Sequence, residues 1–123
     1  TPPQLLTQVR DGVADVVWTL PGYTAGRFPV SEVFELPFIT GGREASSRAL
    51  WDLSQSRASQ EFAGMKPIAT WVSAQFAEPD EVAKWQAAAG PVTAGWVEEI
   101  TAKGMDGRSL HEEARALIDK YSK

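Results

Sequence analysis

The residues with the most suggestive chemistry are Trp18, Thr19 and Tyr23, which stand close together in the run GVADVVWTLPGY. An aromatic wall beside a hydroxyl group suits a small organic acid, because apolar contact and a few placed polar groups give a ligand its orientation. Large aromatic side chains in a sheet more often serve as packing. The alternative is therefore that Trp18 belongs to the core and Tyr23 packs over it.

Arg27, in the run GRFP, carries a guanidinium group that can hold a carboxylate through two parallel hydrogen bonds. A single arginine in a polar loop is weak evidence for a ligand site. The simpler role is to hold its own loop by bonding backbone carbonyls or the carboxylates of Glu32 and Glu35. Those carboxylates have no nucleophile or metal ligand near them in the sequence, which favours a solvated or helix-capping role for both.

The sequence contains few of the residue patterns that form enzyme active sites or metal centres. His111 is the only histidine and there is no cysteine, which excludes a multi-histidine metal site within one chain and a cysteine-ligated zinc. No GxSxG motif accompanies His111, and the glycine runs GYTAG and ITGG lack the lysine and Ser/Thr of a phosphate-binding loop. We therefore expect no catalytic residue, metal or cofactor, and we expect His111 at the surface.

Two apolar runs predict the β-strands that would position the aromatic residues. Residues 14–20 contain Val-Val-Trp without polar alternation, which is typical of a strand covered on both faces in a parallel α/β sheet. Residues 67–74 predict a second strand, and a helix over 43–61 would complete a βαβ crossover. Ligands of such sheets bind beyond the carboxyl ends of the strands, so the loop after Leu20 is the expected site.

The C-terminal part is predicted to be helical. Apolar residues at three- and four-residue steps run from Pro79 toward Gly104. Proline removes a hydrogen bond inside a helix, so Pro91 predicts a kink or a division into two helices. A capping box at Ser109 and Glu112 predicts the start of the final helix.

Composition is consistent with one domain over residues 1–123. The hydrophobic content of 43%, with five tryptophans and five phenylalanines, is enough for a core. A formal charge of −4 and a pI near 5.0 argue against nucleic acid as a partner, because phosphate binding needs a basic face.

Three runs of residues resemble a known family. GVADVVWTLPGY, GRFP and SEVFELPF are similar to the periplasmic solute-receptor subunit of TRAP transporters, the DctP-like proteins. Residues 1–75 resemble a segment of the N-terminal lobe. Residues 76–123, with AAAGPVTAGWVEEITAKGMDGRSLHEEARALIDKY, resemble the terminal helices. The resemblance implies a non-enzymatic protein that captures organic acids between two closing lobes, a periplasmic location, and docking on the membrane subunits of the transporter.

The resemblance also implies a set of ligand-binding residues: Trp18, Thr19, Tyr23, Arg27 and Phe38. Family members are much longer, and nothing after PIATWVSA matches the section that carries their carboxylate-pairing arginine. We therefore expect an α/β fold that is a partial lobe of a periplasmic binding protein. It would have a short, mainly parallel sheet flanked by helices and an all-helical C-terminal part. Such a lobe is expected to bind organic acids weakly, or not at all, by itself.

The alternative function is a self-associating interaction or assembly domain derived from such a receptor, without a role in transport. A two-stranded sheet is marginal alone, and the unpaired edges of an apolar sheet invite association. We therefore expect a homo-oligomer, and exchange of a strand or helix between copies is a low-cost route to it.

Overall fold

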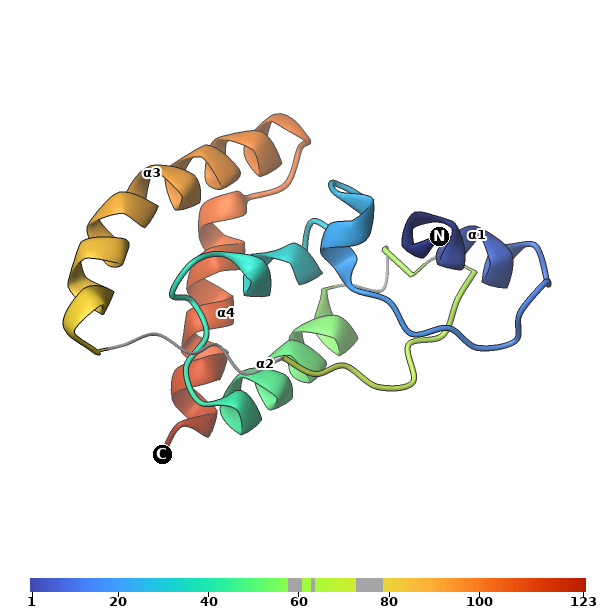
Figure 1. Cartoon of the computed structure of the whole chain (residues 1–123), viewed down its shortest axis with the longest axis horizontal. Coiled ribbons are helices and arrows are strands. Elements are labelled where there is room, and N and C mark those ends of the chain that lie inside the picture. The colour runs from blue at the N-terminus through green and yellow to red at the C-terminus, as the bar shows by residue number, and fades with distance from the viewer. Residues whose placement is uncertain (58–60, 63, 73–78) are drawn as a thin grey trace.

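A computed structural model describes residues 1–57, 61, 62, 64–72 and 79–123, with side chains in the helix after residue 79 described from Gln86 onward. The described residues form seven helical elements and no β-strand. In chain order these are the 3-10 helix η1 (Pro2–Gln4), α1 (Leu5–Arg10), the 3-10 helices η2 (Pro21–Thr24) and η3 (Ser31–Glu35), α2 (Arg43–Ser56), α3 (Pro79–Ala102) and α4 (Gly107–Tyr121) (Figure 1). No helix in this part of the chain combines the length and apolarity needed to cross a membrane.

The predicted α/β fold is therefore wrong. Residues 14–20 have no regular secondary structure, and neither do residues 67–72 of the second predicted strand; residues 73–74 lie outside the described residues. A strand covered on both faces needs helices on both sides of a sheet. Here α2 packs instead against α4 and η3, and Val16, in the middle of residues 14–20, is 67% exposed.

The core lies where α2, α4 and η3 meet (Figure 1). Val33 from η3 and Leu53 from α2 are fully buried there. Helix α4 contributes Leu110, Ala114 and Ile118, whose four-residue spacing places them on one face, and all three are buried as their spacing predicts. Part of the core is therefore built from helix faces whose periodicity is visible in the sequence. Residues outside the helices complete it: Val30, Leu36, Ile39 and Val72.

Helix α4 begins at a different cap from the predicted one. The Asp106 side chain accepts a hydrogen bond from the Ser109 N–H at 2.9 Å, so Asp106 is the N-cap and Ser109 lies in the first turn. Gly104, with a φ of +86°, turns the chain after α3, and this backbone conformation favours glycine. The helix therefore starts close to the end of α3, which brings the two helices together.

Helix α3 continues through Pro91 as one helix, contrary to a division into two, and it curves along its length (Figure 1). Among the α3 side chains that the structure describes, residues 86–102, contact with the core is made by the C-terminal part. Ile100 is 1% exposed and Trp96 is partly buried against the core, whereas Val92 is 53% exposed. Over residues 86–102, the predicted apolar stripe is thus used for packing only near the end of the helix.

Candidate functional site

The clearest surface feature is a pair of stacked tryptophans. The rings of Trp18 and Trp71 have centroids 6.0 Å apart and planes within 3° of each other. At that centroid distance the parallel rings are offset, which is a favourable geometry for aromatic pairs. Both remain open to solvent, at 61% and 52% exposure. Trp18 is a predicted site residue, whereas Trp71 lies in the second predicted strand, residues 67–74, and is not among the predicted site residues.

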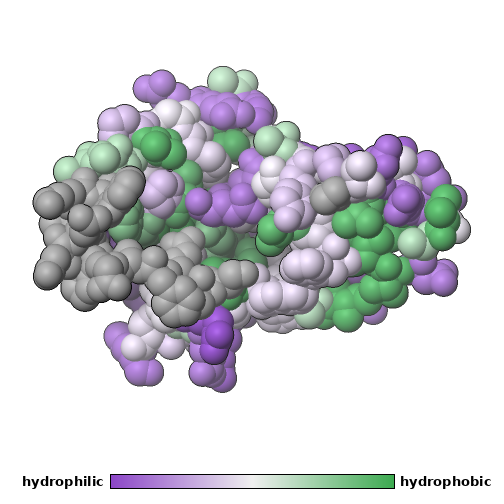
Figure 2. All heavy atoms as spheres, in the orientation of Figure 1, coloured by the Kyte–Doolittle hydropathy of each residue, from purple (hydrophilic) through white to green (hydrophobic). Residues whose placement is uncertain are grey.

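Exposed apolar side chains gather around this stack. We call residues 13–23 and 65–72 the tryptophan surface. Eight large hydrophobic side chains are exposed among the described residues, and all but Val92 belong to this surface: Val13, Val16, Trp18, Leu20, Tyr23, Ile68 and Trp71. Figure 2 shows apolar residues collected on the corresponding side of the molecule. Contiguous apolar patches on a protein of this size mark sites of interaction.

Two threonines of the tryptophan surface have buried hydroxyl groups. The Oγ1 atoms of Thr19 and Thr70 form no hydrogen bond with any described residue. A buried polar group without a partner costs about 1–3 kcal/mol. Thr19 and Thr70 adjoin the two stacked tryptophans in sequence, so the surface combines apolar area with unused hydrogen-bonding capacity.

The loop after the tryptophan surface is held by its own carboxylates. Glu35 Oε1 accepts a hydrogen bond from the Gly22 N–H at 2.9 Å, and Glu32 Oε1 accepts one from the Gly26 N–H at 2.8 Å. A Cβ atom added at Gly22 would collide with the Glu35 carboxylate. These glutamates therefore fix the loop from residue 22 to residue 26, a role that differs from the predicted solvation or helix capping.

A third carboxylate, Glu61, holds the start of η3 from a distant part of the sequence. It accepts hydrogen bonds from the Val30 N–H, the Ser31 N–H (3.3 Å) and the Ser31 hydroxyl (3.1 Å). Burial raises the pKa of Glu61, although these hydrogen bonds oppose the shift and the charge of Glu32 adds to it. No local sequence pattern indicates this contact, because Glu61 and its partners lie about thirty residues apart in the chain.

Arg27 is exposed, and its guanidinium carbon lies 5.8 Å from the centroid of the Phe28 ring. Its backbone N–H donates to the Thr24 carbonyl at 3.0 Å. The guanidinium forms no ion pair or hydrogen bond with any described residue, and the glutamates that would have held it bind backbone amides instead. This cation remains open to an anion from solution.

Phe38 has a backbone φ of +59°, which is uncommon for a residue other than glycine, and its side chain is half-buried in the turn before α2. No hydrogen bond, ion pair or ring contact between described residues joins any two of the five predicted site residues. The structure instead brings Trp18 to Trp71.

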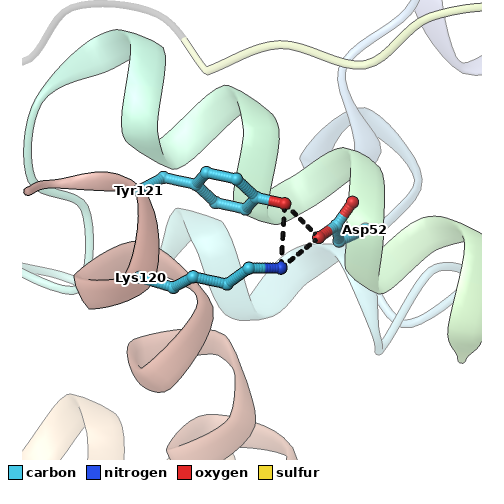
Figure 3. Close-up of polar contacts among 3 residues, drawn as sticks. All are labelled: Asp52, Lys120 and Tyr121. Atoms are coloured by element: carbon cyan, nitrogen blue, oxygen red, sulfur yellow. Dashed lines mark hydrogen bonds and ion pairs between the residues drawn. The ribbon is translucent and has the colours of Figure 1, made fainter.

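A polar cluster that the sequence analysis missed joins the last turn of α4 to α2 (Figure 3). The Tyr121 hydroxyl donates to Asp52 Oδ2 at 2.5 Å, and Lys120 Nζ donates to the same oxygen at 3.3 Å and to the Tyr121 hydroxyl at 3.1 Å. The Tyr121 hydrogen bond, with the Lys120 interactions, holds the pKa of Asp52 below its usual value. The arrangement contains no activated nucleophile, so we assign it a structural role.

Two shallow surface hollows flank this cluster. One, of about 480 Å³, is lined by Asp52, Gln55, Ser56, Glu113 and Leu117. The other, of about 460 Å³, is lined by Gly42, Arg43, Glu44, Ala45, Tyr121 and Ser122. Neither includes a predicted site residue. Among the described residues, no group of three or more histidine, aspartate or glutamate side chains is placed to hold a metal ion.

Comparison with known proteins gives no assignment. No model of a known protein family matches the chain, and a search of curated proteins found no match.

Proposed function

We propose that this chain provides one wall of an organic-acid cleft and belongs to the solute-binding component of a periplasmic TRAP-type uptake system. The supporting observation is exposed aromatic area, which we call the aromatic wall: Trp18 is stacked on Trp71, and Tyr23 is exposed further along the first segment. Two of these residues lie in GVADVVWTLPGY, the run that most resembles the family. Aromatic area beside a few polar groups suits small carboxylates.

An exposed cation in the loop that follows Tyr23 supports the same ligand class. Arg27 has no anionic partner among the described residues, and a guanidinium is well matched to a carboxylate. The adjoining loop already binds carboxylates through backbone N–H groups, although these come from Glu32 and Glu35 of the same chain. An added acid would therefore depend on Arg27 and the aromatic wall.

A single wall limits the affinity. Ligand sites commonly bury 70–90% or more of a small ligand, whereas the rings of this wall are about half exposed. In the family that the chain resembles, a second lobe closes over the ligand, and binding favours the closed state. We therefore propose a dissociation constant near or above about 1 mM for the lone chain, with docking on transporter subunits as the role of the complete receptor.

Nuclear magnetic resonance titration with succinate and benzoate tests this function. The expected result is weak, saturable shifts of the Trp18 and Trp71 side-chain N–H signals and the Arg27 amide. Benzamide, which lacks the carboxylate, should produce smaller shifts. Replacement Arg27→Ala should remove the difference between benzoate and benzamide, whereas Arg108→Ala, an exposed arginine on α4, should preserve it.

Two outcomes would contradict the proposal. Shifts that are absent, or spread evenly over the chain, would remove the aromatic wall as a ligand site. A micromolar or tighter affinity in calorimetry would contradict the view that the lone chain offers an incomplete cleft.

The alternative, a self-associating domain without transport function, is favoured by the same exposed apolar area.

A further inference from the structure

We infer that the tryptophan surface is a self-association surface and that its occupant is the tryptophan surface of a second copy of this chain. This inference concerns the chain without ligand and does not rest on the binding of organic acids. Three observations carry it: unpaired backbone groups, the distribution of charge, and the apolar area.

The backbone of the tryptophan surface is largely unpaired. Residues 15–19 and 66–71 form no backbone hydrogen bond with another described residue, and the two segments are not joined by a ladder. A row of free N–H and C=O groups is a template for pairing with another chain. The same runs carry the valine, isoleucine and tryptophan residues that favour strands. A second copy presents the same unpaired groups.

The charges of the tryptophan surface in one copy are complementary to those in a second copy. Asp15 and Lys66 are the only charged residues of the tryptophan surface, and both are exposed. The surface is thus neutral although the whole chain carries −4. In a two-fold pair, the first segment of one copy can face the second segment of the other. This arrangement brings Asp15 toward the partner's Lys66 twice.

The apolar area is sufficient for a weak dimer. With roughly 200 Å² per aromatic side chain, the exposed fractions of Trp18, Tyr23 and Trp71 (61%, 48% and 52%) amount to roughly 300 Å². The exposed aliphatic side chains raise the area to on the order of 500 Å² per copy, or about 1,000 Å² for a pair. That total is at the lower end for specific interfaces.

Sedimentation equilibrium over a concentration series tests the inference. The natural chain should show a reversible monomer–dimer equilibrium below about 1 mM. Trp18→Ser with Trp71→Ser should raise the dimer dissociation constant at least about tenfold. Val92→Ser is the matched control, because Val92 is 53% exposed on α3, outside the tryptophan surface; it should change the constant less than about twofold. Circular dichroism of each variant checks that the helices persist.

If the tryptophan variants fail to fold, exchanging the charges of Asp15 and Lys66 still tests the dimer interface. Asp15→Lys and Lys66→Asp should each weaken the dimer, and the two together should restore it. A monomer up to about 1 mM, equal weakening by Val92→Ser, or no restoration in the double exchange would overturn the inference. Titration of a dilute, monomeric sample with carboxylates measures ligand binding at Arg27 independently of dimer formation. Failure of the self-association proposal is therefore distinguishable from failure of the organic-acid proposal.

Discussion

Glu61 is the residue whose environment differs most from what its position in the sequence indicates. It lies at the end of the predicted helix 43–61, where a solvated side chain is the ordinary expectation. In the structure its carboxylate is partly buried against the backbone of Val30 and Ser31. Such a contact depends on how distant segments pack, so sequence periodicity carries no information about it.

The raised pKa of Glu61 gives a pH dependence with a definite sign. The native chain keeps the Glu61 proton to a higher pH than the unfolded chain does. Between the two pKa values the native state therefore binds more protons, and stability falls as pH rises. This contribution is fully present below the unfolded value, near 4.5, and is lost as pH rises through the higher native value.

Replacement Glu61→Gln should remove that part of the pH dependence. The free energy of unfolding of the variant should decline less than that of the natural chain between about pH 4 and pH 7. Chemical denaturation at several pH values measures this. The control Glu98→Gln, on the exposed side of α3, makes the same change in net charge. It should show the same dependence of the unfolding free energy on pH as the natural chain. Equal profiles for the natural chain and Glu61→Gln would contradict the assigned environment.

The residues of the candidate site were predictable only in part. Trp18 and Tyr23 attract attention because bulky aromatic residues next to a glycine- and proline-rich loop are conspicuous. Trp71 does not attract the same attention, because it lies within the apolar run 67–74, which resembles a strand. Trp71 stacks on Trp18 because neither predicted strand forms and no sheet separates the two side chains. Whether a sheet forms depends on distant residues, so the local sequence does not indicate this contact.

At the scale of elements, helices were predictable and strands were not. The apolar face of α4 follows from spacing within one segment, and its burial confirms the pattern. A strand instead needs a partner and two covering layers, both supplied by distant residues. Residues 14–20 have strand-like composition, but neither layer is present around them among the described residues.

Two glycines, one inside α3 and one at the start of α4, provide a test of the helix packing. A Cβ atom added at Gly95, within α3, would meet nothing within 4 Å. At Gly107, the first residue of α4, it would lie 2.8 Å from the Val97 carbonyl oxygen. The first position has room for a side chain and the second does not.

Gly95→Ala should therefore stabilise the chain by about 0.5–1 kcal/mol, because alanine loses less backbone entropy than glycine in a helix. Gly107→Ala should destabilise it by about 1–3 kcal/mol, because the two helices must separate. Urea denaturation of both variants measures the difference. Two changes of the same sign would show that α3 and α4 do not pack as described.

At the scale of the whole molecule, a helical core is combined with an exposed apolar surface. Most of the core residues come from η3, α2 and α4. The tryptophan surface contributes Val72 to that core, whereas its large exposed apolar side chains lie outside it. The proposed organic-acid capture and the proposed self-association would both use this surface, and both would require another component to cover it.

Hydrogen–deuterium exchange at low and high protein concentration tests this account most directly, because it reports on the backbone of the tryptophan surface itself. The account predicts rapid exchange at residues 15–19 and 66–71 in dilute solution and slower exchange as concentration rises. Exchange within α2 and α4 should stay slow at both concentrations. Strong protection of residues 15–19 and 66–71 already in dilute solution, or rapid exchange there at every concentration, would contradict it.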